Sequence, residues 1–227
     1  MNNLPPYPPE RICDSLAPCV TDERLRRFDK VLENRTLALT LVLDNVYHEH
    51  NISAVIRSAD AFGIHAIHVV GGASRMNSGI ALGSERWLNI YRHETADEAL
   101  RVVKSEGYKT VVLQAPHSSG QYEALPSVPV ESLPFAQEKL ALVFGNEVKG
   151  AAEDFFATAD YRAYLSMVGF VESFNISVAA ALCLYAARHC GRQMPPISDE
   201  ERLNTKARWL REDVPGAELI LKRMLSK

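Results

Sequence analysis

The sequence lacks the features that would direct it into a membrane or out of the cell. Its 227 residues include no apolar run long enough to cross a bilayer. The opening segment, MNNLPPYPP, has neither the basic region nor the apolar core of a secretory signal. We therefore expect a globular cytoplasmic protein, and the balance of 47% hydrophobic and 23% charged residues is ordinary for that class.

Cysteine is also scarce. The chain has four cysteines, with no Cys-x-x-Cys spacing and no histidine cluster beside any of them. Zinc sites and disulfide frameworks usually show such spacing, so we expect reduced thiols and no metal centre.

Glycine is missing where a dinucleotide site would need it. A predicted strand over 37–43 is followed by DNVYHEHN over 44–51, which contains no glycine. A Rossmann-type site requires a glycine-rich turn directly after its first strand. This absence disfavours NAD binding and the Rossmann-like methyltransferases.

Positive charge is not in excess, because the net charge is −3. It is instead concentrated in two segments near the ends of the chain. Such clusters are typical of solvated helix faces, and the alternative is a local RNA-binding surface. The N-terminal cluster is Arg24, Arg26, Arg27, Lys30 and Arg35, and the C-terminal one is Arg202, Lys206, Arg208 and Arg211.

Between these segments, strand and helix patterns alternate, which predicts a mostly parallel sheet covered on both faces. Residues 1–20 have no periodic apolar pattern and are expected to be an irregular arm, and 115–136 a long connector. The predicted strands are 37–43, 66–70, 110–114 and 140–144; the predicted helices begin after Thr21, at 51, after Thr95, near 175, at 199 and at 215.

Three polar loops each follow an apolar run. They contain NISAVIRSA over 51–59, FGNEVKG over 144–150 and SFNISVAA over 173–180. Because ligands of open α/β sheets bind at the carboxyl ends of the strands, three such loops predict one shared site.

These three motifs, in this order, resemble those of the SpoU (TrmH) branch of the SPOUT superfamily of RNA 2′-O-methyltransferases. The resemblance extends from about residue 22 to about residue 209. It implies S-adenosylmethionine as cofactor and a trefoil-knotted α/β domain, in which the segment from about 140 to 180 passes through an earlier loop. The likeness is strongest to members that methylate guanosine-18 in the D-loop of tRNA, through RLRRFDKVL over 24–32, GSERW over 83–87 and ARWL over 207–210.

The resemblance implies a methyl-transfer centre drawn from all three motifs. In the family, the arginine that matches Arg57 is assigned to the ribose 2′-hydroxyl. Since a guanidinium does not lose its proton in proteins, we interpret Arg57 as a contact to the RNA phosphate and the developing alkoxide. The base is left unassigned, with His48 and His50 as candidates. The expected catalytic residues are Asn51, Arg57, Glu147, Ser173 and Asn175.

The same residues have plain structural interpretations. Asn51 is expected to cap its helix, and Ser173 or Asn175 the helix near 175. Glu147 can be a solvated loop carboxylate. Arg57 lies among apolar neighbours, where burial is costly unless a carboxylate across a helix or subunit boundary pairs with it.

Cofactor contacts are expected along the loops, largely through backbone groups. The third motif is preceded by Leu-Ser-Met where relatives commonly have Ile-Pro-Met, a change that a backbone contact tolerates. The expected cofactor-binding residues are Leu113, Gly145, Asn146, Gly150, Leu165, Met167, Gly169 and Phe174.

The expected organisation is an N-terminal arm and basic helix (1–35), a knotted methyltransferase domain (36–192) and C-terminal basic helices (193–227). The family pairs such domains, and the apolar helix over 175–190 favours a homodimer. Alternatives are methylation of ribosomal RNA or another tRNA position, or a non-catalytic RNA-binding assembly factor of the same fold. The residues expected to bind tRNA are Arg24, Arg26, Arg27, Lys30, Lys206, Arg208 and Arg211.

Overall fold

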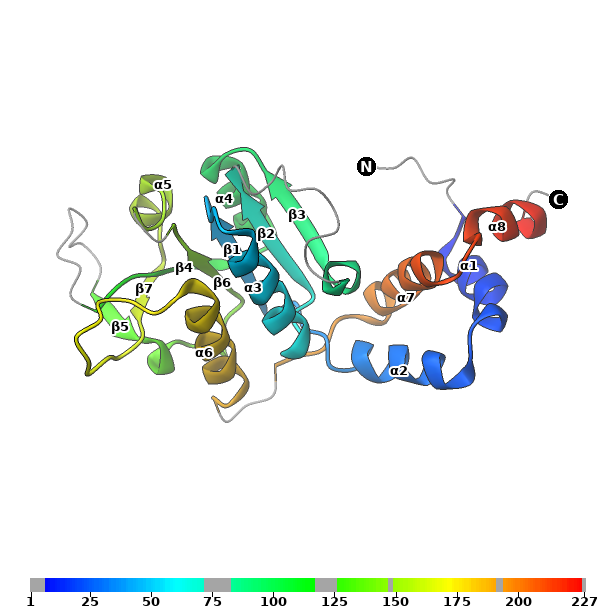
Figure 1. Cartoon of the computed structure of the whole chain (residues 1–227), viewed down its shortest axis with the longest axis horizontal. Coiled ribbons are helices and arrows are strands. Elements are labelled where there is room, and N and C mark those ends of the chain that lie inside the picture. Colours follow the sequence, from blue (N-terminus) through cyan, green and yellow to red (C-terminus); the bar gives the residue numbers. More distant parts are fainter. Residues whose placement is uncertain (1–6, 72–82, 117–125, 147–148, 191–193, 226–227) are drawn as a thin grey trace. The chain divides into compact units, whose positions relative to one another are not determined.

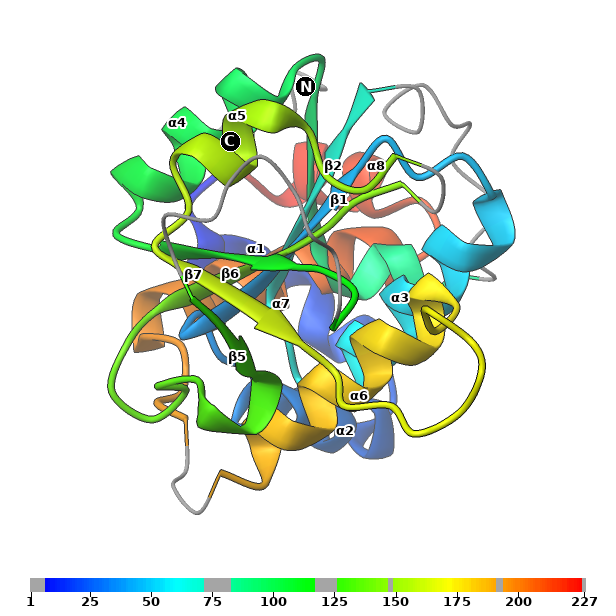
Figure 2. The same cartoon turned by 90° about the vertical axis from the view of Figure 1, so that its left-hand side faces the viewer.

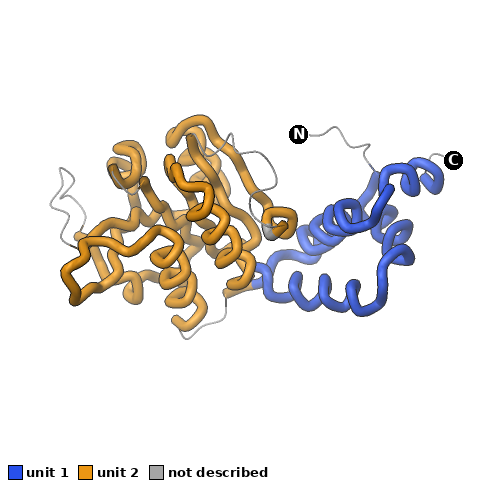
Figure 3. The backbone as a smooth tube through the Cα atoms, in the orientation of Figure 1, with its two compact units in different colours: residues 1–35, 196–227 blue, residues 36–195 orange. Residues whose placement is uncertain are grey.

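The computed structural model describes residues 7–71, 83–116, 126–146, 149–190 and 194–225 (Figure 1). The chain folds into two compact units (Figure 3). Residues 36–195 form one of them, and the two ends of the chain, 1–35 and 196–227, form the other. No helix within the described ranges combines the length and the apolarity needed to span a bilayer.

The larger unit is built on a parallel sheet of seven strands in the order β3-β2-β1-β6-β4-β7-β5. Its central strands are completely buried, which explains their unbroken apolar sequences. The strands are β1 Leu39–Asp44, β2 Ala66–Val70, β3 Asn89–His93, β4 Lys109–Leu113, β5 Ser127–Pro129, β6 Leu140–Phe144 and β7 Tyr161–Tyr164.

Helices cover both faces of this sheet (Figure 2). On one face α3 (Glu49–Ala61) packs against α6 (Ile176–Arg188), and on the other α4 (Ala96–Ser105) packs against α5 (Glu153–Ala157). Alternate residues of β1 enter the two cores: Leu41 and Leu43 lie in the core on the side of α3 and α6, whereas Val42 lies in the other. Because successive side chains of a strand point to opposite faces of the sheet, the one apolar strand contributes to both cores.

The predicted alternation is confirmed for the central elements. The strands at 66–70 and 140–144 have the predicted bounds, and Thr95 caps α4 by accepting a hydrogen bond from the Glu98 amide. Gly107 ends that helix region with a φ of 81°, a conformation that favours glycine. The passage of the chain through an earlier loop stays a prediction of the resemblance.

Several short elements of the larger unit were not predicted. The connector over 115–136 was wrong in part, because 127–129 forms the edge strand β5 and is followed by the 3₁₀ turn η4 (Val130–Ser132). Strands β3 and β7 and helix α5 were also missed, since they are short and only partly apolar. A further 3₁₀ turn, η3 (Ser84–Trp87), precedes β3.

The smaller unit is entirely helical. It contains α1 (Pro9–Leu16), α2 (Asp22–Leu32), α7 (Asp199–Asp213) and α8 (Ala217–Leu225), with the 3₁₀ turn η1 (Ala17–Cys19). Its core includes an edge-to-face contact of Phe28 with Trp209, whose ring centroids lie 5.4 Å apart.

Two expectations for the smaller unit were wrong. Within the arm that was expected to be irregular, 9–16 form helix α1, because proline is tolerated in the first turn of a helix and Ile12 and Leu16 bury one stripe of it. Arg35, counted with the exposed basic cluster, is completely buried, with its guanidinium 5.7 Å from the centre of the Trp209 ring.

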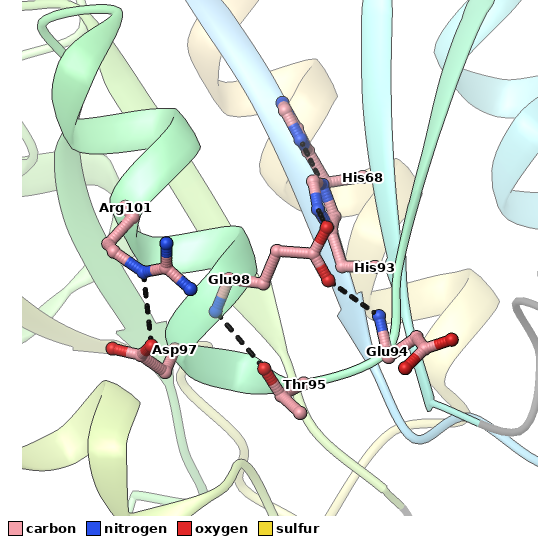
Figure 4. Close-up of polar contacts among 7 residues, drawn as sticks. All are labelled: His68, His93, Glu94, Thr95, Asp97, Glu98 and Arg101. Atoms are coloured by element: carbon pink, nitrogen blue, oxygen red, sulfur yellow. Dashed lines mark hydrogen bonds and ion pairs between the residues drawn. The ribbon is translucent and has the colours of Figure 1, made fainter.

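A buried pair of histidines joins β2, β3 and α4 (Figure 4). Nδ1 of His68 lies 3.0 Å from Nε2 of His93, and Nδ1 of His93 lies 3.8 Å from a carboxylate oxygen of Glu98. The tautomer that serves both contacts carries its proton on Nδ1 of each ring, so the pair is neutral. Burial lowers the pKa of His68 to about 4, and burial also lowers the pKa of His93 despite the opposing effect of Glu98.

We therefore predict that the protein loses stability in mild acid. The unfolded chain takes up a proton on each ring near pH 6.5, whereas the folded chain resists until a lower pH, so stability is full above about pH 6.5 and falls towards pH 4. For His68 the slope should approach about 1.4 kcal/mol per pH unit, and His93 contributes in the same direction. Urea unfolding across this range measures it.

His68→Phe should flatten this pH dependence, whereas His189→Phe, at an exposed position, should leave it unchanged. A wild-type free energy of unfolding that stays constant from neutral pH to pH 5 would contradict the prediction.

Candidate functional site

The three polar loops leave the sheet at the carboxyl ends of its strands, as predicted; this side of the sheet is called the shared edge below. Strands β1, β6, β4 and β7 are consecutive neighbours and all parallel, so their carboxyl ends lie together. The loop before α3 follows β1, the loop before α5 follows β6, and the loop before α6 follows β7.

A direct hydrogen bond joins the first and third motifs. Nδ2 of Asn175 donates to Oδ1 of Asn51 over 3.1 Å. The other end of the Asn175 side chain caps α6, because its Oδ1 accepts from the backbone amide of Ser177 at 2.9 Å and from the Ser177 hydroxyl at 2.6 Å. Asn175 is therefore held at both ends and can orient Asn51.

The expectation that Asn51 caps α3 was wrong. The helix begins two residues earlier, at Glu49, and the carbonyl of His48 accepts hydrogen bonds from the amides of Asn51 and Ile52. The Asn51 side chain is consequently available for a partner outside its own helix, and Asn175 is one such partner.

The second motif forms a tightly closed loop. Asn146 and Gly150 exchange two backbone hydrogen bonds, and the Asn146 side chain donates to the carbonyl of Asn45 and accepts from the amide of Lys149. A Cβ atom on Gly145 would lie 1.9 Å from the amide nitrogen of Ala151, so only glycine fits there. Glu147, expected to be catalytic, lies outside the described residues.

Arg57 is exposed on α3, so the single chain does not bury it as its apolar neighbours suggested. No other described residue forms a hydrogen bond or ion pair with its guanidinium. Ser173 is likewise exposed and does not cap α6. Both side chains are thus open to a ligand or to another chain.

Asp44 and Asn45 were not singled out from the sequence. Asp44 ends β1 and is 1% exposed, and its two oxygens accept from the Ala152 amide at 2.6 Å and from Nδ2 of Asn45 at 2.8 Å. Burial raises the pKa of this carboxyl, and the two hydrogen bonds oppose that rise. The available signal was a carboxylate at the end of an otherwise apolar strand.

The expected cofactor residues line the same edge. Leu113 ends β4, and Leu165, Met167, Gly169 and Phe174 lie in the loop between β7 and α6. From 166 to 174, no backbone amide of this loop donates a backbone hydrogen bond within the described parts of the chain. Its side chains Val168 and Phe170 are fully exposed.

Most of the expected RNA-binding residues are ion-paired within the smaller unit. Arg24 makes a bidentate pair with Asp213, at 2.9 and 2.7 Å, and Arg211 pairs with Glu218 at 2.7 Å. Lys206 pairs with Asp29, and Arg208 with Glu212. By contrast, Arg26, Arg27 and Lys30 are exposed on one face of α2.

Comparison with known proteins defines the class. Residues 38–185 match the SpoU rRNA Methylase family. The chain is 30% identical to a tRNA (guanosine(18)-2′-O)-methyltransferase of Borreliella burgdorferi, over 90% of this chain and 92% of that protein. It is 31% identical to the protein of that name from Thermus thermophilus, over 85% and 98%. The chain belongs to the SpoU family of RNA methyltransferases.

Solved structures agree. The A. aeolicus TrmH/SpoU tRNA modifying enzyme superposes with a TM-score of 0.72 at 29% identity, covering 86% of this chain and 98% of that one. The SpoU methyltransferase AviRb of Streptomyces viridochromogenes, in complex with AdoMet, superposes with a TM-score of 0.58 at 25% identity, covering 70% and 62%. The family uses S-adenosylmethionine as its cofactor.

The described residues fit that cofactor in kind. Adenosine presents an apolar ring with polar edges, and the loop between β7 and α6 offers exposed apolar side chains beside open backbone amides. A helix N-terminus favours a carboxylate such as that of the methionine moiety, and α6 begins at the end of this loop. Among the described residues, no group of three or more histidine, cysteine or acidic side chains is placed to hold a metal ion.

We predict that Asn175→Ala weakens the site more than it weakens the fold. Loss of the cap should cost about 1 kcal/mol of stability, as should Thr95→Ala at the cap of α4. Only Asn175→Ala removes the hydrogen bond that orients Asn51, so only this variant should lower the methyl-transfer rate. Urea unfolding and single-turnover methylation measure the two effects, and equal loss of activity in both variants would contradict the prediction.

Proposed function

We propose that this protein is an S-adenosylmethionine-dependent tRNA 2′-O-methyltransferase that modifies guanosine-18 of the D-loop, acting in the cytoplasm. The observation that carries the proposal is the joining of the first and third motifs by the Asn51–Asn175 hydrogen bond at the edge where the other loops also end. Two relatives of that name match along 90% and 85% of the chain, which favours this substrate over ribosomal RNA.

The chemistry needs a ribose hydroxyl to lose its proton as it attacks. The bound cofactor supplies an electrophilic methyl group on a sulfonium. Arg57, which stays protonated, contacts the RNA phosphate and stabilises the negative charge that develops on the ribose oxygen. Asn51 and Asn175 orient the reacting ribose, with Glu147 and Ser173 as further members of the centre.

The cofactor is held by the loops that end at the shared edge. The closed loop after β6 contains Gly145, Asn146 and Gly150. Leu113 is the last residue of β4, which lies between the two strands that lead into the cofactor loops. Leu165, Met167, Gly169 and Phe174 present backbone groups and apolar surface. This assignment rests on placement and on the open amides of the loop.

The decisive experiment is methylation of unmodified tRNA transcripts that differ only at position 18. The proposal expects a 2′-O-methyl group on guanosine-18 and none when that guanosine is replaced. Methylation of another tRNA ribose or of a ribosomal RNA fragment would show that the protein has a different substrate. Failure to bind S-adenosylmethionine would favour an assembly factor.

We predict that Arg57→Ala abolishes turnover and changes cofactor affinity by no more than a few fold. Loss of one transition-state donor typically costs about 10²–10³ in rate. Arg57→Lys should be nearly as inactive, because a point charge cannot reproduce the planar guanidinium. Arg101→Ala, an exposed arginine of α4 paired with Asp97, is the matched control. Near wild-type rates in either Arg57 variant would remove Arg57 from the mechanism.

The ion pairs of the smaller unit divide the basic residues into two roles. Arg24, Lys206 and Arg211 join helices of the unit, and Arg208 pairs with Glu212 within α7. Arg26, Arg27 and Lys30 present charge to solvent and are proposed to capture the RNA backbone.

Arg26→Ala/Arg27→Ala should therefore raise the Michaelis constant for tRNA and lower the slope of log affinity against log salt by about 2, because each phosphate that is no longer neutralised accounts for about 1. Lys222→Ala/Arg223→Ala removes the same charge from exposed positions of α8 and should change neither quantity. Equal salt slopes for the wild type and the α2 variant would show that these arginines do not bind RNA and only form a solvated helix face.

A homodimer is part of the proposal. The loop before α6 exposes Val168, Phe170 and Val171, and the outer stripe of α6 exposes Val178, Leu182 and Tyr185 at helical spacing. Exposed apolar side chains gathered on one loop and one helix stripe mark an interaction site, and a second copy of the chain would cover them and bring a further set of loops to the open Arg57.

We predict that Leu182→Lys yields an inactive monomer, because it places a charge in that apolar surface. Leu219→Lys, at a 75% exposed leucine of α8, should remain dimeric and active. Sedimentation velocity at micromolar concentration distinguishes the outcomes. A fully active wild-type monomer would refute the dimer.

A further inference from the structure

The end of β1 is tied to the loop of the second motif by two hydrogen bonds, and a third holds the two anchoring residues together. Asp44 accepts from the amide of Ala152 over 2.6 Å, Nδ2 of Asn45 donates to the other oxygen of Asp44 over 2.8 Å, and the Asn45 carbonyl accepts from Nδ2 of Asn146 over 3.0 Å. The two residues thus hold the loop at its beginning and at its end.

We propose that Asp44 is a positioning residue, which fixes the loop over 145–152 and through it the groups that this loop presents at the shared edge. This inference rests on the proposed function. Asp44 itself does not reach the edge, because it is 1% exposed and both oxygens are occupied by donors of this chain.

A carboxylate is required at this position. The two donors approach different oxygens, so an amide would turn its own NH₂ group towards one of them. Burying a carboxylate is unfavourable unless its oxygens are hydrogen-bonded, and a residue needed only to fill the strand end would be uncharged like the rest of β1.

The backbone beside Asp44 is strained in support of this arrangement. Asn45 has a φ of 50°, the left-handed region that non-glycine residues rarely adopt. Space for its side chain depends on Gly71 at the end of β2, where a Cβ atom would lie 2.0 Å from Oδ1 of Asn45. Strain of this kind persists where the surrounding contacts enforce it, commonly at functional sites.

The same chain contains a matched contact remote from the loop. Asp160 accepts from the amide of Thr110 over 2.8 Å and from its hydroxyl over 3.1 Å, at the amino end of β4. Both donors use the same oxygen of the exposed Asp160, so the amide oxygen of Asp160→Asn can accept both. This variant therefore makes the same carboxylate-to-amide change at the opposite end of the strands, where it should leave the loop over 145–152 undisturbed.

The test compares Asp44→Asn with Asp160→Asn by hydrogen exchange and by kinetics. Asp44→Asn should speed exchange of the Gly150 and Ala152 amides by about ten-fold or more, and lower kcat/KM for tRNA by about ten-fold or more. Asp160→Asn should change neither. Unchanged exchange and kcat/KM in Asp44→Asn, or equal losses in both variants, would overturn the proposal.

A milder variant covers the case in which Asp44→Asn does not fold. Asn45→Gly suits the positive φ and keeps the carbonyl that Asn146 uses, but removes the hydrogen bond to Asp44. It should produce the same effects at a few-fold level, and wild-type values of both would again overturn the inference. The exchange measurement needs neither RNA nor cofactor, so it judges the role of Asp44 even if the proposed methylation fails.

Discussion

The site depends on the parallel direction of four neighbouring strands. Because β1, β6, β4 and β7 all run the same way, the loops that follow them leave the sheet at the same edge. Segments more than a hundred residues apart in sequence, such as Asn51 and Asn175, are thereby brought to hydrogen-bonding distance. An antiparallel sheet would send alternate loops to opposite edges, and no arrangement of the same motifs could then form one centre.

Two sets of hydrogen bonds fix the positions of the loops at this shared edge. Asn175 joins α6 to α3 and caps its own helix, and Asp44 with Asn45 ties β1 to the loop after β6. Asp44 and Asn146 are buried, Asn45 and Asn51 are partly buried, and Asn175 is exposed. Arg57 is exposed as well. The single chain therefore orders the surroundings of the proposed site and leaves Arg57 open to a ligand or to another chain.

The helical unit shows that charge counted along a sequence is a poor measure of charge offered to a partner. Arg24 and Arg211 lie in clusters that suggest RNA binding, yet their guanidinium groups pair with Asp213 and Glu218. Arg35 is completely buried. Only a few cations of these clusters, those on the outer face of α2, remain as candidates to meet a polyanion, which is consistent with local rather than global attraction in a protein of net negative charge.

The sequence by itself determined what depends on neighbours along the chain. Apolar runs identified the buried strands at 66–70 and 140–144, Thr95 marked the start of α4, and the three motifs named the family. Tertiary structure decided the rest. Edge strands such as β5 are too short and too polar to be recognised locally, and α1 buries only a narrow stripe that becomes apparent against α7. The partners of Asn51, Asp44 and Arg24 lie more than a hundred residues away, because hydrogen bonds and ion pairs depend on proximity in space, which no local pattern records.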